Sequence, residues 1–256
     1  MNDIKNIEPS QTTAPGMGYT HCCAPVLSVV YNEDCLEGLK RFSDNYFDLA
    51  IVDPPYGIGA DKAQNAAAAQ REKANGKSKA GRGWKAYKET DWDNETPSAE
   101  YWRELRRVSK NQIVWGGNYF TDHLEPKMGW IVWNKMQRDF SLADGELAWT
   151  SFDKAMRIFD MSRGEALAKN NETGGRFHPT QKPVKLYEWI LQNYASEGDL
   201  ILDTHFGSGS IALAVDKANR LDKMNLHLTA CEIDKEYIDK AIKRISESIK
   251  QCTLSF

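Results

Sequence analysis

Strand-like and helix-like segments alternate along most of this chain, and this alternation limits the folds that it can adopt. The clearest example lies near the C-terminus, where the apolar run 200–203 precedes a Gly-Ser-Gly turn and a helical segment, and the run 226–232 precedes another. Apolar runs that are each followed by a helix are typical of parallel strands, because the crossover returns the chain to the same end of the sheet. We therefore predict an α/β fold, with a mostly parallel sheet and helices on both faces.

The same patterns predict the other elements. We expect strands at 26–31, 48–53, 112–115, 129–134, 146–152, 155–160, 200–203 and 226–232. We expect helices at about 36–42, 97–109, 183–196, 209–222 and 235–250, of which the second is capped by a serine or Thr96 and the third starts at Pro183. Residues 161–177 lack periodicity and are expected to be irregular.

The N-terminal segment differs in character from the rest of the chain. Residues 1–24 are polar and lack periodicity, so we expect a disordered tail there and a single domain at 25–256. This segment carries Asp3 and Glu8, and no run of the chain reaches the roughly 18 apolar residues of a membrane span. We therefore expect a cytoplasmic protein with no membrane partner. His21–Cys23 lacks the second ligand pair of a zinc site, so we expect no metal.

A rigid polar corner, Asp53-Pro54-Pro55-Tyr56, directly follows the buried-type strand 48–53. Ligands of open α/β sheets bind beyond the carboxyl ends of the strands, which is where this corner lies. The two prolines fix φ twice and remove two N–H donors, leaving a carboxylate, a carbonyl and an aromatic ring together. Two acceptors on an exocyclic amine of a planar base would free the nitrogen lone pair, and the ring would stack on the base. A strand-ending Asp and a structural Pro-Pro turn remain the alternative for these residues alone.

A second segment has the character of a cofactor site. The strand 200–203 leads into Gly207-Ser208-Gly209, where the backbone can approach a ligand closely and the next helix begins. The following strand ends at Glu232, whose carboxylate is placed to accept bonds from ribose hydroxyls or else to cap the last helix. The pair favours a cofactor that contains a nucleoside.

Together these segments resemble the DNA N6-adenine/N4-cytosine amino-methyltransferase family in its permuted, β-type order, in which the DPPY motif precedes the cofactor loop. The resemblance covers residues 26–245 and includes the blocks 32–37, 53–57, 178–183 and 203–210, with 230–232 after them. It implies a Rossmann-like methyltransferase fold with a short inserted recognition region, and S-adenosyl-L-methionine as the cofactor. It implies that the catalytic residues are Asp53, Pro54, Pro55 and Tyr56. The implied cofactor-binding residues are Asp34, Cys35, Asp53, Thr180, Gln181, Lys182, Asp203, His205, Phe206, Gly207, Ser208, Gly209, Ser210 and Glu232.

Two positions need comment within this resemblance. The segment 178–183 offers hydroxyl, amide and ammonium groups at a helix start, which suits the carboxylate of the cofactor. The family's cofactor loop usually runs Asp-Pro-Phe-x-Gly-x-Gly, whereas Thr204 and His205 stand here in place of Pro and Phe. His205 can still pack flat against the cofactor, but it adds a titratable nitrogen.

The resemblance implies double-stranded DNA as the partner, with the target base flipped out of the duplex. The net charge is −3, so a DNA contact requires a local basic surface. The loop 57–89 holds eight Lys or Arg and three Asp or Glu, a balance of +5. The region 134–177, where the family places target recognition, adds Lys135, Arg138, Lys154, Arg157, Arg163, Lys169 and Arg176. Because this region is short, we expect a short recognition site shared by a homodimer.

The motif leaves the target open between adenine N6 and cytosine N4. Asp53 at its head favours adenine, because the cytosine enzymes of this family more often carry Ser there. A methyltransferase for protein or RNA amines is a second class, although such relatives typically have Asn at that position. An inactive DNA-binding module is a third, and the intact Asp53, Tyr56 and Gly207 argue against it.

Overall fold

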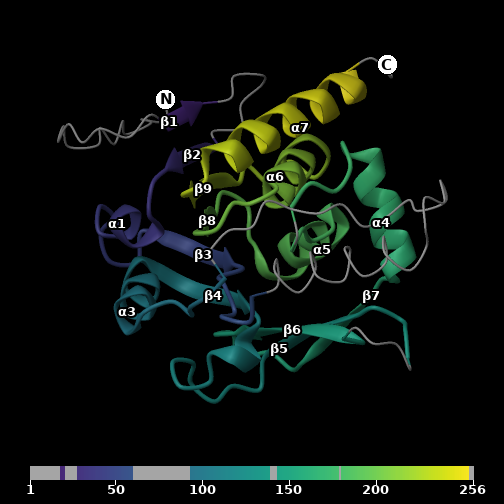
Figure 1. Cartoon of the computed structure of the whole chain (residues 1–256). Coiled ribbons are helices and arrows are strands. Elements are labelled where there is room, and N and C mark those ends of the chain that lie inside the picture. Colours follow the sequence, from purple (N-terminus) through teal and green to yellow (C-terminus); the bar gives the residue numbers. More distant parts are fainter. Residues whose placement is uncertain (1–17, 21–27, 60–92, 139–142, 179, 254–256) are drawn as a thin grey trace.

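A computed structural model describes residues 18–20, 28–59, 93–138, 143–178 and 180–253 (Figure 1). Within these residues one nine-stranded sheet has the order β1-β2-β9-β8-β3-β4-β6-β5-β7. Its strands are β1 (Gly18–Thr20), β2 (Val29–Asn32), β3 (Phe47–Val52), β4 (Ser109–Trp115), β5 (Trp130–Asn134), β6 (Gly145–Thr150), β7 (Arg157–Asp160), β8 (Leu200–Asp203) and β9 (His227–Glu232). The helices are α1 (Cys35–Leu39), α3 (Ala99–Val108), the 3-10 turn η1 (Gly117–Tyr119), α4 (Arg163–Glu172), α5 (Val184–Tyr194), α6 (Ser210–Leu221) and α7 (Lys235–Thr253).

The sheet is mostly parallel, as predicted. β2, β9, β8, β3 and β4 pair in parallel and form one continuous block. β6 runs antiparallel to both β4 and β5, and β7 is parallel to β5. All five strands of the parallel block therefore end at the same edge, where the sequence places Asp53, Asp203 and Glu232.

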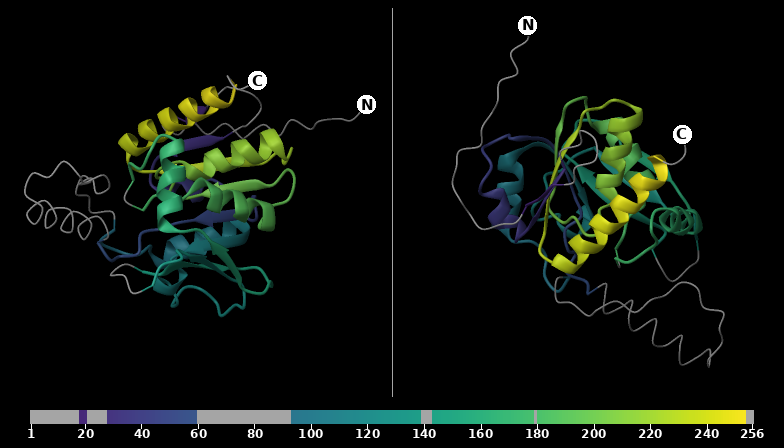
Figure 2. Two further views of the ribbon diagram at one scale, coloured as in Figure 1. Left: turned by 90° about the vertical axis from the view of Figure 1, so that its right-hand side faces the viewer. Right: turned by 90° about the horizontal axis from the view of Figure 1, so that it is seen from above.

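Helices cover both faces of the sheet, which confirms the predicted architecture. Alternate residues of β3 point to opposite faces, so Leu49 and Ile51 join one hydrophobic cluster while Ala50 and Val52 join the other. The first cluster contains the buried sides of α4, α5, α6 and α7, and the second contains those of α1 and α3. The view from above in Figure 2 shows α1 and α3 on one side of the sheet and α4, α5 and α6 on the other.

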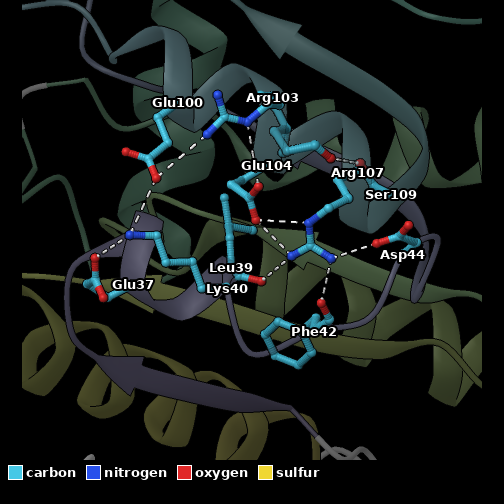
Figure 3. A network of polar contacts seen from close by, with 11 residues as sticks. Glu37, Leu39, Lys40, Phe42, Asp44, Glu100, Arg103, Glu104, Arg107 and Ser109 are labelled. Carbon is cyan, nitrogen blue, oxygen red and sulfur yellow. Dashed lines mark hydrogen bonds and ion pairs between the residues drawn. The ribbon is translucent and has the colours of Figure 1, made fainter.

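α3 is fixed to the α1 segment by a network of charges (Figure 3). The Arg107 guanidinium bonds Glu104 Oε2 at 2.8 and 2.9 Å and Asp44 Oδ1 at 2.9 Å. It also donates to the carbonyl oxygens of Phe42 at 2.8 Å and Leu39 at 3.3 Å. Because the main-chain carbonyls take part, this arginine holds the chain between α1 and β3 in place as well as pairing charges.

Three predictions made from the sequence differ from the structure. Residues 161–177 were expected to be irregular, yet Arg163–Glu172 form α4, whose first turn is capped by Ser162 Oγ accepting from Glu165 N at 3.1 Å. Its inward residues are Ala166 and Asn170, which give no apolar stripe to recognise. Pro183 is the cap residue before α5, not its first residue.

The third correction concerns the segment expected to be a disordered tail. Gly18–Thr20 form β1, which pairs antiparallel with β2 at the edge of the sheet. The remainder of 1–24 lies outside the described residues, and so do residues 60–89 of the basic loop. The other predicted elements agree to within a few residues with those observed. No helix of the described part is long and apolar enough to span a membrane.

Candidate active site

A cavity of about 280 Å³ opens at the carboxyl edge of the parallel strands. It is bordered by the residues that follow β2, β3, β8 and β9 and by the segment that precedes α5. Most of the predicted site residues line it: Asp34, Cys35, Asp53, Pro55, Thr180, Gln181, Lys182, His205, Phe206, Gly207, Ser208, Ser210 and Glu232. Pro54, Tyr56, Asp203 and Gly209 are not among its lining residues.

The turn between β8 and α6 takes its shape from two left-handed glycines. Gly207 has φ +49° and Gly209, the cap residue of α6, has φ +68°. A Cβ at Gly209 would lie 3.0 Å from the Phe206 ring. Ser208 and Ser210 line the cavity beside the N-terminus of α6, so hydroxyl groups and the positive end of a helix dipole face it together.

Glu232 holds this turn against the end of β9. Its Oε2 accepts from Gly207 N at 2.8 Å, and its Oε1 accepts from Asp234 N at 3.0 Å. Burial raises the pKa of Glu232, and these two main-chain bonds partly offset the effect. The carboxylate therefore both supports the turn and lines the cavity.

Asp203 acts from beneath the turn. It is buried, and its Oδ1 accepts from His205 N at 3.0 Å. Burial raises the pKa of Asp203 to about 7. Asp203 therefore supports the Gly207–Ser210 turn from below. It does not line the cavity, although it was predicted to bind the cofactor.

The two residues that depart from the family pattern form a polar cluster with α3. Thr204 Oγ1 lies 2.7 Å from Tyr101 Oη and 2.9 Å from His205 Nδ1. Burial lowers the pKa of His205 to about 4, so its ring is neutral at physiological pH. Where the family pattern has the apolar pair Pro-Phe, this chain therefore has polar side chains whose hydrogen-bonding groups are paired with one another and with Tyr101.

The residues at the start of α1 have local roles as well. Asp34 caps α1, accepting from Leu36 N at 2.9 Å and from Glu37 N at 3.2 Å. Burial raises the pKa of Cys35 to about 12, so it is a thiol and not a thiolate. Its Sγ lies 3.9 Å from His205 Nε2.

The Asp53–Tyr56 corner is held by Asp93, an acid that sequence reasoning missed. Asp93 Oδ1 accepts from Tyr56 N at 2.8 Å and from Gly57 N at 3.0 Å. The Tyr56 hydroxyl donates back to Asp53 Oδ1 at 2.7 Å. Of these three bonds, only the last, between residues three apart, could be anticipated from the sequence.

The Tyr56 ring is packed between aromatic residues and bare backbone. Tyr119 stacks on it with ring centroids 4.9 Å apart and planes within 14°, and Phe120 meets its edge. Gly116 has φ +69°, and a Cβ there would lie 2.2 Å from the ring. The missing side chain at Gly116 therefore leaves room for the Tyr56 ring.

Lys182 lies at the Asp53–Tyr56 corner as well as beside the Gly207–Ser210 turn. Its ammonium donates to Asp53 Oδ2 and lies 3.5 Å from Glu146 Oε2. Lys135 Nζ, from the residue after β5, lies 2.6 Å from Glu146 Oε1. The sequence missed Glu146, and it offered Lys135 for DNA contact although that side chain is buried.

The other cations of the region 134–177 fall into two groups. Arg163 and Arg176 are half-buried. Those that are exposed, and so accessible to a phosphate backbone, are Arg138, Lys154, Arg157 and Lys169. No group of three His, Cys, Asp or Glu side chains within the described ranges is arranged to hold a metal ion.

Residues that were not among the predicted site residues also line the cavity. His178 meets the Tyr237 ring at 4.4 Å, and burial lowers the pKa of His178 to about 3. Tyr187 of α5 also lines the cavity. The remaining unpredicted lining residues are Glu33, Thr204, Ile211, Ile233 and Asp234. Tyr187 and Tyr237 lie within amphipathic helices, where an aromatic residue is more often a core residue than a ligand contact.

Comparison with known proteins finds similarity to DNA methyltransferases. Residues 125–243 match the model of the N6/N4 family described as DNA methylase. The type II methyltransferase M.HpaI of Haemophilus parainfluenzae is 27% identical over 270 residues, covering 86% of this chain and 77% of that protein. M.HinfI of Haemophilus influenzae is 24% identical, covering 86% and 69% respectively. The chain is thus similar to the N6/N4 DNA methylase family over residues 125–243, and to these two type II methyltransferases over most of its length.

Solved structures share the fold. The M1.HpyAVI–SAM complex superposes with a TM-score of 0.51 at 20% identity, covering 86% of this chain and 99% of that one. The PvuII DNA methyltransferase, described as cytosine-N4-specific, gives 0.50 at 14% identity, covering 88% and 92%. These likenesses confirm the predicted fold class.

Proposed function

We propose that the protein transfers a methyl group from S-adenosyl-L-methionine to the exocyclic amino group of a flipped base in double-stranded DNA, and that the base is adenine. The observation that carries this proposal is the position of Asp53 and Tyr56 at the end of β3, beside a cavity whose other wall is the Gly207–Ser210 turn. Similarity to the N6/N4 DNA methylase family and to M.HpaI supports the DNA substrate. The β-type motif order stays a prediction.

The chemistry of the cavity fits the proposed cofactor. Glu232 offers an acceptor for ribose hydroxyls, and Phe206, Ile233 and Tyr237 offer apolar and aromatic surface for an adenine ring. Ser208 and Ser210 at the α6 N-terminus suit a carboxylate. When bound, the cofactor supplies an electrophilic methyl group on a sulfonium centre.

The residues of the catalytic corner then act on the base. Asp53 and the Pro54 carbonyl accept from its amino group, so that the nitrogen lone pair is directed away from the ring. Tyr56 is held by Asp93 and by its own bond to Asp53, and a base that stacks on its ring takes the place of the Tyr119 ring. Burial raises the pKa of Asp53 and Lys182 offsets part of that rise. Asp53 thus accepts strongly while its charge is balanced.

Asp53 at the head of the motif supports adenine over cytosine. The name of the PvuII enzyme concerns cytosine N4 in that protein, and its likeness to this chain extends to the fold alone. We also propose that the loop 57–89 and the exposed cations of 134–177 contact DNA phosphates, and that two subunits share a short recognition site. A strict monomer on DNA in sedimentation would contradict the dimer.

Methylation of unmodified genomic DNA tests the proposal. The purified protein is incubated with labelled S-adenosylmethionine and DNA, and the DNA is digested to nucleosides. We expect the digest to contain N6-methyldeoxyadenosine, and we expect the Asp53→Ala variant to form none. N4-methylcytosine would move the target to cytosine, and label in a protein or RNA substrate but not in DNA would refute the DNA assignment. Sequencing that detects modified bases then identifies the site.

A further inference from the structure

A line of four alternating charges runs from the catalytic corner into the recognition region. Asp53, at the end of β3, binds Lys182, which precedes α5. The Lys182 ammonium lies 3.5 Å from Glu146 of β6, and Glu146 lies 2.6 Å from Lys135. The Lys182 side chain is only 3% exposed, so water cannot replace these partners. The β6 carboxylate is thereby coupled to the catalytic acid through one shared ammonium group.

This sharing affects the capacity of Asp53 to accept further hydrogen bonds. Its Oδ1 already accepts from the Tyr56 hydroxyl at 2.7 Å, and its Oδ2 accepts from Lys182. A target amine must bind to the same carboxylate, so Lys182 and the amine compete for it. Among the residues that the structure describes, Glu146 is the other carboxylate within ion-pair distance of Lys182.

We infer that Glu146 is a positioning residue that draws Lys182 away from Asp53 when the target amine binds, so that Asp53 becomes free to accept from it. This inference rests on the proposed function, because it assumes that Asp53 accepts from an amino group. Lys135 keeps the Glu146 carboxylate in place from its other oxygen. The residue would connect target recognition to catalysis, since β6 belongs to the segment predicted to contact DNA.

The electrostatics of the neighbourhood give the two partners opposite effects on Asp53. Burial raises the pKa of Asp53, Lys182 lowers it, and Glu146 raises it. Burial alone would raise the pKa of Glu146, but Lys182 and Lys135 lower it overall. Burial likewise opposes the charge of Lys182, yet Asp53 and Glu146 raise its pKa above the ordinary value. Glu146 is therefore charged at physiological pH and able to hold Lys182.

Other groups face this line from the surrounding elements. They are Tyr56 beside Asp53, Asp203 at the end of β8, Tyr187 of α5, Arg163 of α4, and His178 and Arg176 before α5. Glu146 also raises the pKa of Tyr56, Tyr187 and Arg163, and Lys182 also lowers that of His178 and Asp203. The test therefore depends on the direction in which the limb set by Asp53 moves in each variant.

The test compares Glu146→Gln with Glu188→Gln, a matched change in an ion pair with Lys217 (2.7 Å) away from the cavity. Single-turnover methyl transfer to DNA is measured against pH, together with S-adenosylmethionine binding. We expect Glu146→Gln to transfer roughly a hundredfold more slowly, the scale of a misplaced reacting group. Cofactor affinity should stay within about twofold of the wild type, and Glu188→Gln should match the wild type in both measurements.

The pH profiles distinguish positioning from a purely structural role. The limb on which activity appears as Asp53 ionises should move to lower pH in Glu146→Gln, because a negative neighbour is lost. It should move to higher pH in Lys182→Met, because a positive neighbour is lost. Shifts in the same direction, or no shift in either variant, would overturn the inference.

In Glu146→Gln the buried Lys135 loses its carboxylate partner, which could destabilise the fold. A double variant that also removes the charge of Lys135 controls for this effect. The double variant Glu146→Gln/Lys135→Gln should unfold like the wild type but transfer as slowly as the single variant. Recovery of the wild-type rate in the double variant would show that Glu146 serves only to neutralise Lys135. If the wild-type protein itself methylates no DNA, the proposed function fails. A wild-type rate in Glu146→Gln overturns this inference alone.

Discussion

Gly116→Ala tests whether the position of the Tyr56 ring controls methyl transfer. The added Cβ would lie 2.2 Å from the ring, whereas ordinary contact begins at 3.4 Å, so the ring must move by at least the difference of 1.2 Å. A displacement of about 1 Å at a reacting centre costs roughly a hundredfold in rate, or about 2.7 kcal/mol of barrier. The left-handed backbone at φ +69° adds about 1–2 kcal/mol of strain to the folded state.

A second glycine separates strain from displacement. Gly198 has φ +82°, and a Cβ there finds nothing within 4 Å. Gly198→Ala should therefore lower the melting temperature by a few degrees through strain alone, at about 2–4 °C per kcal/mol for a chain of this size, and leave transfer unchanged. The assay is single-turnover incorporation of labelled methyl into DNA, with thermal unfolding measured in parallel. Wild-type transfer by a folded Gly116→Ala variant would refute the reasoning.

Three further substitutions probe the groups that hold the site. Glu232→Gln should weaken S-adenosylmethionine binding about tenfold, as measured by calorimetry. The carboxylate accepts from Gly207 N and Asp234 N, whereas the amide NH₂ of glutamine would face one of these donors and could not accept from it. Burial raises the pKa of Asp203 from the ordinary 3.8 to about 7, so the folded protein binds this proton more tightly than the unfolded chain does. The free energy of unfolding should therefore fall as the pH rises from about 4 to about 7, and this fall should vanish in Asp203→Asn. Asp93→Ala should destabilise the protein by about 2–4 kcal/mol in urea, since the N–H groups of Tyr56 and its neighbour lose their acceptor.

Each of these has an outcome that would contradict it. Undiminished cofactor affinity in Glu232→Gln would remove the carboxylate from the binding site. An unchanged pH dependence in Asp203→Asn, followed by urea unfolding at pH 5 and pH 8, would assign that dependence to another group. Asp93→Asn keeps one acceptor oxygen, so it should recover most of the loss; equal damage from both variants would indicate that the negative charge matters more than the bonds.

The sequence was sufficient to predict the position of a site residue wherever that residue follows a strand. Asp53 and Glu232 each follow an apolar run, and the glycines after β8 mark the turn, so topology alone brings these residues to one edge. The site that results is the cavity described above, which most of the predicted residues line. Local pattern was informative here because position in a parallel sheet depends on the order of strands and not on the details of side chains.

The sequence was insufficient where partners meet across elements. Glu146 lies in the middle of an ordinary strand pattern, and its link to Lys182 depends on how β6 packs beside β4. Lys135 illustrates the reverse error, because a cation in a predicted recognition region is normally solvated, whereas this one is buried. α4 was missed because its inward residues, Ala166 and Asn170, carry too little hydrophobicity to produce a helical period.

Arg244 of α7 connects the cofactor turn to the end of α4. Its guanidinium donates to Ser208 O at 2.9 Å, to Ser210 Oγ at 3.0 Å and to the Thr173 carbonyl and hydroxyl oxygens at 2.6 and 2.9 Å. Every residue that it holds is synthesised before it. On the ribosome the turn therefore emerges without this support, and it gains its final shape only after the last turns of α7 have left the exit tunnel. The turn therefore matures later than its own place in the sequence would indicate.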